Sequence, residues 1–145
     1  EIKNNSKYKY KSIFKYSNYN KKRKTVTLKG VRNRKIKKAV VPATVKYKGT
    51  SYKITVLSSG AFKNCKKLKN VAIGKNVKSL GKNCFINCRK LKKITVKSKI
   101  LRKAGKNSLK KTNRKLKIAC NRKKIKKYRK IFKNKGNKTY RIIKI

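Results

Sequence analysis

The side chains able to do chemistry in this sequence are few. The chain has four cysteines and no histidine, and its one acidic residue is Glu1. Paired-carboxylate, histidine-triad and His- or carboxylate-ligated metal chemistries therefore lack their parts. Cys84 and Cys88 stand close in sequence, but neither a histidine nor a set of converging thiolates supports a zinc site there. We expect no metal and no cofactor.

Serine with lysine is the remaining nucleophile and base, at Ser58, Ser59 or Ser108. Because 51 of the 145 residues are Lys or Arg, a lysine near a serine carries almost no information. Nothing else in the sequence would orient such a base or hold an oxyanion. We therefore expect the protein not to be an enzyme and to have a binding or structural role.

Charge is the remaining functional signal. The net charge is +50, and its self-repulsion within a Debye length of about 8 Å opposes compaction unless salt or polyanions offset it. A solvated lysine coat is the alternative interpretation, but this charge favours a fixed polyanionic partner. Lysines outnumber arginines 42 to 9, whereas base-edge and bidentate phosphate recognition favour arginine. This ratio favours wall or host polymers over nucleic acid.

A repeat organises the middle of the chain. Residues 60–73 recur at residues 83–96, a period of about 23 residues. Five apolar positions correspond between the copies: Phe62 with Phe85, Cys65 with Cys88, Leu68 with Leu91, Val71 with Ile94, and Ile73 with Val96. Such self-similarity predicts stacked units that together bury one continuous core, which is a solenoid.

The outer copies of the repeat are degraded. In a third copy, Leu109 takes the Phe position, Thr112 the Cys position, and Ile118 and Cys120 the two strand positions. Residues 41–45 read as a half-repeat before the first copy. Because terminal units of a solenoid are atypical, these segments are expected to adjoin its caps.

The stretch from Ile54 to Ile100 resembles the BspA-like class of bacterial leucine-rich repeats, with its pattern Val-x-x-Ile-Gly-x-x-Ala-Phe-x-x-Cys-x-x-Leu-x-x-Ile-x-Ile-Pro. The departures are Ser58 for Gly, Cys84 for Ala, and Gly74 or Lys97 for Pro; they leave the Phe, Leu and Ile ladders intact. The resemblance implies an extracellular or cell-surface bacterial protein that adheres to host or wall polymers.

The strand of each repeat alternates between two faces. In the first copy, Val71 and Ile73 are expected to point inward, with Asn70 and Ala72 outward. The stacked strands should form a small sheet. Its expected outward residues are Asn70, Lys93, Thr95, Lys117 and Ala119.

Segments before the repeats predict an N-terminal β cap. Alternation over residues 6–17 is a strand signal, and further strands are expected at 25–28 and 39–41. Residues 46–54 read as a hairpin that turns at Gly49-Thr50.

Segments after Cys120 predict a C-terminal cap. Asn121 is a candidate helix N-cap and Gly136 a candidate helix stop. Ile125, Tyr128, Ile131 and Phe132 fall near helical spacing, and residues 139–145 read as a last strand.

The expected fold is therefore β-rich α+β: a short leucine-rich-repeat solenoid with an N-terminal β cap and a C-terminal helix and strand cap. We expect a single domain over 1–145, with the β cap and half-repeat at 1–53, the repeats at 54–120 and the C-terminal cap at 121–145. No apolar run is long enough for an integral membrane span. Because the chain contains no Met, we expect it to be part of a longer translation product.

Cys65 and Cys88 occupy equivalent repeat positions, so stacking would place them one rung apart, about 4.7–5 Å, within the Cα range of a disulfide. Buried free thiols that fill small apolar slots are the preferred interpretation, and a Cys65–Cys88 bridge is the alternative.

We expect a non-enzymatic, highly cationic module of a secreted or cell-surface bacterial protein that attaches to an anionic polysaccharide or wall polymer, such as teichoic acid, capsule, mucin or host glycosaminoglycan. Sequence-independent nucleic-acid binding through phosphate contacts is the alternative. A cationic membrane-active protein is less favoured, because only the short helix near Ile125 is amphipathic. The candidate polyanion-binding residues are Lys66, Lys67, Lys69, Arg89, Lys90, Lys92, Lys93, Lys117, Arg122, Lys123, Lys124, Lys126, Lys127, Arg129 and Lys130.

Overall fold

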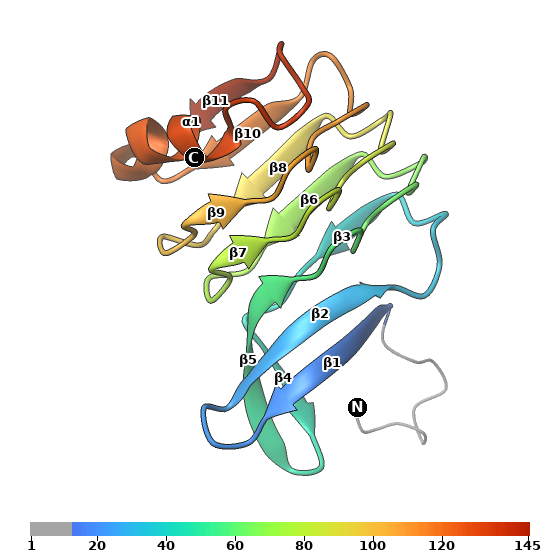
Figure 1. Ribbon diagram of the computed structural model, residues 1–145, viewed down its shortest axis with the longest axis vertical. Coiled ribbons are helices and arrows are strands. Elements are labelled where there is room, and N and C mark those ends of the chain that lie inside the picture. Colours follow the sequence, from blue (N-terminus) through green and yellow to red (C-terminus); the bar gives the residue numbers. More distant parts are fainter. Residues whose placement is uncertain (1–12) are drawn as a thin grey trace.

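The computed structural model describes residues 13–145, which form a β-solenoid with one short helix near its C-terminal end (Figure 1). Two sheets form its faces, here called sheet A and sheet B. The strands of sheet A are β1 (Phe14–Asn20), β2 (Thr25–Val31), β4 (Thr44–Tyr47), β5 (Thr50–Leu57), β7 (Ser79–Leu80) and β9 (Lys103–Ala104). The strands of sheet B are β3 (Lys38–Val40), β6 (Asn70–Ile73), β8 (Lys93–Val96), β10 (Lys117–Cys120) and β11 (Arg141–Lys144).

The strand order follows the repeat. Sheet A runs β1-β2-β5-β7-β9, with β4 paired to β5, and sheet B runs β11-β10-β8-β6-β3. All pairs in sheet B are parallel, because the chain leaves the sheet between successive strands, through sheet A in the repeats and through the helical segment between β10 and β11. A 3-10 helix, η1 (Arg122–Lys124), and the helix α1 (Ile125–Phe132) lie between β10 and β11. The expected solenoid with a C-terminal helix is confirmed.

The register of sheet B confirms the predicted equivalences. Val71 is the Cα partner of Ile94, and Ile94 is the Cα partner of Ile118. Ile73 is likewise paired with Val96. All five side chains are buried. The third copy of the repeat, although degraded in sequence, therefore continues the same inward ladder.

Aromatic side chains form a ladder through the core. Phe62 and Phe85 are fully buried, and their rings stack with centroids 5.2 Å apart and an interplanar angle of 13°. Phe14 of β1 meets Phe62 edge-on at 6.1 Å, so the N-terminal cap closes this end of the ladder. Leu68 and Leu91 are also fully buried. Hydrophobic burial along these rows is the main force that holds the rungs together.

The backbone of each turn is bonded to the next rung. The Phe62 amide donates to the Cys84 carbonyl at 2.8 Å, and the Phe85 amide donates to the Ser108 carbonyl at 2.9 Å. These bonds join equivalent turns of successive rungs, just as the sheet hydrogen bonds join equivalent strands. They satisfy backbone groups that the small core would otherwise leave unpaired.

The N-terminal β cap differs from the prediction in two details. The strand expected at 6–17 is β1 at Phe14–Asn20, and residues 6–12 lie outside the described part of the chain. The hairpin turns at Lys48-Gly49 rather than Gly49-Thr50, because Tyr47 is paired with Thr50. Lys48 and Gly49 have φ angles of 50° and 80°, as a two-residue turn between twisted strands requires.

The C-terminal cap begins as expected but its helix ends early. The Asn121 side chain accepts a hydrogen bond from the Lys123 amide at 2.9 Å, which caps η1. The helix α1 ends at Phe132, so Gly136 is not its stop. Gly136 has a φ of 103°, and a Cβ there would lie 2.7 Å from the Cα of Lys110. Glycine is needed because the chain passes closely over the preceding rung.

Candidate polyanion-binding surface

The structure divides the expected polyanion-binding residues between two regions. Eight belong to the rungs and lie in the turns before β6 and β8 or at the start of a sheet-B strand: Lys66, Lys67, Lys69, Arg89, Lys90, Lys92, Lys93 and Lys117. Seven belong to the C-terminal cap: Arg122, Lys123, Lys124, Lys126, Lys127, Arg129 and Lys130. All are exposed except Lys124, which is half-buried.

A row of cations crosses the strands of sheet B. Lys93 and Lys117 are Cα partners on β8 and β10, and Arg141 on β11 is the partner of Lys117. On the other side, Lys93 is paired with Asn70, which is paired with Lys38. We call these five residues the sheet-B row. Because neighbouring strands lie about 4.7–4.9 Å apart, the row offers a cation at every step except Asn70.

The turns that lead into sheet B add a second set of cations. Lys66 and Lys69 of one rung correspond to Arg89 and Lys92 of the next, and the Lys92 amide donates to the Lys69 carbonyl at 2.9 Å. This bond places equivalent side chains on adjacent rungs. In the third rung the pattern is broken by Asn113, whose side-chain amide donates to the Arg89 carbonyl at 3.2 Å.

The cap helix presents its cations at the end of the stack. Tyr128 and Phe132 are buried, and the Tyr128 hydroxyl donates to the Ser98 carbonyl at 2.7 Å, which anchors α1 to the third rung's loop. Burial raises the pKa of Tyr128, so the phenol stays neutral as a donor. The helix packs against β9 and β11 (Figure 1). Its basic residues therefore lie at the C-terminal cap, beside the strand β11 that carries Arg141 of the sheet-B row.

No Asp or Glu side chain occurs among residues 13–145, because the only acidic residue is Glu1. The exposed cations of these residues consequently have no carboxylate side chain from the same region to pair with. Like charges at rung spacing repel each other, and salt or a bound polyanion reduces that repulsion. The surface can thus attract anionic groups over its whole length.

The four thiols are buried and form no disulfide, which agrees with the preferred interpretation of free thiols over a Cys65–Cys88 bridge. Burial raises the pKa of Cys84 and of Cys120. The hydrogen bond with Cys65, followed by burial, raises the pKa of Cys88, and the same bond lowers the pKa of Cys65. The Cys88 thiol also donates to the Phe62 carbonyl at 3.0 Å. These thiols fill core positions and are shielded from reagents.

The other side chains considered for chemistry are dispersed. Ser108 is fully buried, Ser58 is half-buried and Ser59 is exposed. Within residues 13–145, no three His, Cys, Asp or Glu side chains gather where they could hold a metal ion.

Sequence reasoning did not include two cations of the sheet-B row. Lys38 and Arg141 were absent from the candidate residues because the register of β3 and β11 depends on tertiary hydrogen bonding. A local signal does exist, since both precede an inward-facing apolar residue, as Lys93 precedes Ile94. Ala119, by contrast, was expected on the outer face of sheet B but is buried. It follows the outward register but is only 2% exposed, because it stands between the larger Thr95 and Ile143.

Comparison with known proteins agrees with this geometry, which is that of a bacterial leucine-rich-repeat solenoid. Residues 44–143 match the family described as the BspA type leucine-rich repeat region (6 copies), a longer stretch than the Ile54–Ile100 resemblance. The chain therefore belongs to the BspA-type leucine-rich repeat family. A comparison with curated protein sequences gave no match.

Solved structures show the same fold. A leucine-rich cell surface protein from Faecalibacterium prausnitzii A2-165 is 23% identical, with a TM-score of 0.65, over 75% of this chain and 29% of that protein. A leucine-rich repeat protein from Bacteroides ovatus ATCC 8483 is 18% identical, with a TM-score of 0.57, over 94% of this chain and 41% of that one. A leucine-rich repeat protein from Bacteroides capillosus ATCC 29799 is 20% identical, with a TM-score of 0.53, over 74% of this chain and 94% of that protein. The chain thus spans less than half of the first two proteins.

Proposed function

We propose that this repeat module is a non-enzymatic part of a secreted or cell-surface bacterial protein and binds extended anionic polymers. The observation that carries the proposal is the sheet-B row, in which Lys38, Lys93, Lys117 and Arg141 stand in register, with no Asp or Glu side chain among residues 13–145 to pair with them. The turn cations widen the same side of the solenoid. A linear array of this kind suits a linear polymer better than a compact substrate.

Location and chemistry support the proposal in different ways. The family is a bacterial repeat family, and a structural neighbour from F. prausnitzii is a cell surface protein. No helix among residues 13–145 is long and apolar enough to cross a membrane. The four thiols and Ser108 are buried, and no His, Asp or Glu among residues 13–145 could activate Ser58 or Ser59. Binding rather than catalysis is therefore the role we assign.

Lysine contacts spread over many residues make the binding electrostatic and tolerant of polymer type. Each anionic group that pairs with a lysine releases condensed counterions, so affinity should fall log-linearly with salt concentration. The test compares heparin, wall teichoic acid, duplex DNA and a neutral glycan by a binding titration at several salt concentrations around 0.15 M, where screening is physiological.

The proposal predicts that the three anionic polymers bind with modest differences at matched charge density and that the neutral glycan does not bind. A neutral glycan held equally tightly at high salt would overturn the electrostatic mechanism. A strong preference for DNA at matched charge density would favour the nucleic-acid alternative.

A further inference from the structure

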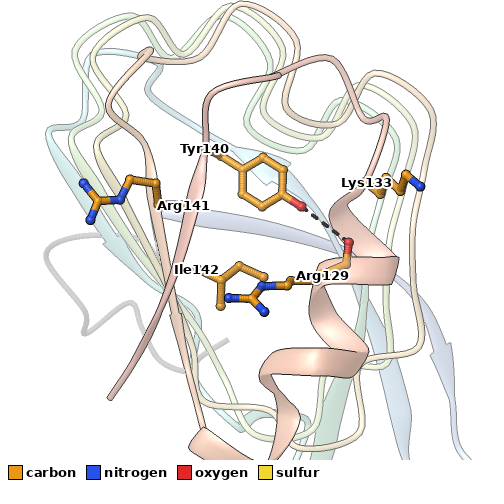
Figure 2. A pocket seen from close by; sticks show the side chains of 5 residues that line it. All are labelled: Arg129, Lys133, Tyr140, Arg141 and Ile142. Carbon is orange, nitrogen blue, oxygen red and sulfur yellow. Dashed lines mark hydrogen bonds between the residues drawn. The ribbon is translucent and has the colours of Figure 1, made fainter.

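An open surface pocket of about 620 Å³ lies at the C-terminal cap, between α1 and β11. It is lined by Arg129, Lys133, Tyr140, Arg141 and Ile142, which we call the cap pocket. Figure 2 shows the Arg129 side chain reaching from α1 over Ile142, with the Tyr140 ring beside them. Its volume falls in the range of small-molecule sites, about 300–1,000 Å³.

The cations of the cap pocket are mostly arginine, unlike those of the chain as a whole. Two of its three cations are arginines, although lysines outnumber arginines 42 to 9 in the sequence. The planar guanidinium presents paired donors that fit an oxyanion, which a lysine ammonium cannot imitate. The pocket therefore differs in kind from the lysine surface of the rungs.

The three cations also have room to respond to a ligand. In Figure 2 the side chains of Arg141 and Lys133 extend away from Arg129 on opposite sides; Arg141 precedes Ile142 on β11, and successive side chains of a strand alternate between its faces. Arg129, Lys133 and Arg141 are all exposed, so their long side chains can reorient. An oxyanion between α1 and β11 would attract all three.

The wall between the cations is apolar. Tyr140 and Ile142 are both half-buried, and the Tyr140 hydroxyl donates to the Arg129 carbonyl at 3.4 Å, which turns its ring toward the helix. The ring face and the Ile142 side chain offer a surface on which the C–H face of a sugar ring can pack. The pocket thus combines oxyanion donors with a platform for a small ring.

We propose that the cap pocket binds a monosaccharide unit that carries a phosphate or sulfate ester. The ester lies between Arg129 and Arg141, and the sugar ring lies on Tyr140 and Ile142. This inference rests on the proposed function in one respect, because both assume that the ligand of this protein is anionic. A small ligand tests it separately from polymer binding.

The experiment is an amide NMR titration of the whole chain with glucose 6-phosphate and glucose 6-sulfate at about 0.15 M salt, where long-range attraction is screened. Saturable shifts confined to α1 and β11 are expected, and the tighter ligand identifies the ester. Glucose and inorganic phosphate should each bind at least about fivefold more weakly, because each lacks one half of the recognition. Equal affinity for either control ligand would overturn the proposal.

Variants that keep the charge isolate the geometry. Arg129→Lys and Arg141→Lys should each weaken sugar-phosphate binding about fivefold or more, because a lysine cannot donate in the paired manner. Arg23→Lys and Arg102→Lys, on exposed arginines outside the pocket, are the matched controls and should change affinity less than twofold. Equal losses in the controls would overturn the proposal. A steep salt slope for polymers without saturable sugar-phosphate binding would reject the pocket alone and leave the proposed function standing.

Discussion

Replacing Phe85 by alanine tests the stacked core most sharply. Phe85 is fully buried and its ring stacks on Phe62 at 5.2 Å, and Phe14 contacts Phe62 at the N-terminal end of the same ladder. Truncation removes the burial of the ring and leaves a cavity, which typically costs about 3–5 kcal/mol, including the lost ring stacking. For a chain of this length, that loss corresponds to a fall in Tm of roughly 9–15 °C.

The assay is urea unfolding of the wild type and the variant at fixed moderate salt, so that charge repulsion is the same in both. Phe85→Leu is the matched control, because Leu109 occupies the equivalent position one rung later and is also fully buried. It should cost only about 1–2 kcal/mol. A loss below about 1 kcal/mol for Phe85→Ala, or equal losses for the two variants, would refute the idea that an aromatic ladder holds the rungs together.

Three further predictions concern single positions. Burial raises the pKa of Cys84, so its thiol stays protonated in the folded state at a pH where the unfolded thiol ionises. Above the pKa of the unfolded thiol, this group should therefore lower the free energy of unfolding by about 1.4 kcal/mol per pH unit. Cys84→Ala should lessen that fall in urea unfolding at pH 7.5 and 9.5. Gly136→Ala should lower the Tm more than Gly49→Ala. Both glycines have a positive φ, but of the two only Gly136 has neighbouring backbone within 3 Å of the added Cβ. Equal losses in thermal unfolding would mean that backbone strain alone matters. Tyr128→Phe should cost about 1 kcal/mol through its lost bond to Ser98, and faster amide exchange in α1 should accompany it; unchanged exchange would show that this bond does not anchor the helix.

The repeated part of the fold could be predicted from the sequence because its signals are local and repeated. Phe62 and Phe85, or Val71 and Ile94, have the same neighbours in the chain, so stacking follows from matching the copies. The inward and outward faces then follow from strand alternation. This reasoning placed Lys93 and Lys117 on one face, where the structure has them as partners.

The rest depends on contacts that no short window contains. Lys38 and Arg141 join the sheet-B row only because β3 and β11 dock in register on β6 and β10. The cap pocket likewise needs α1 and β11 brought together. At Gly136, glycine is a weak helix-stop signal in sequence, whereas the structure uses it for a close approach between rungs. Lys48 adopts a positive φ, which sequence statistics disfavour for lysine, because the hairpin register imposes it.

The salt dependence of polyanion binding by a row variant tests the central claim most directly. The variant replaces Lys93, Lys117 and Arg141 by glutamine. Its control removes three exposed lysines of sheet A in the same way: Lys29, Lys53 and Lys103. If each row cation neutralises one phosphate of duplex DNA, the log–log salt slope of the row variant should become shallower by about 2.7, and that of the control by less than about 1. Equal changes in slope for the two variants would contradict the claim that the sheet-B row is the binding surface.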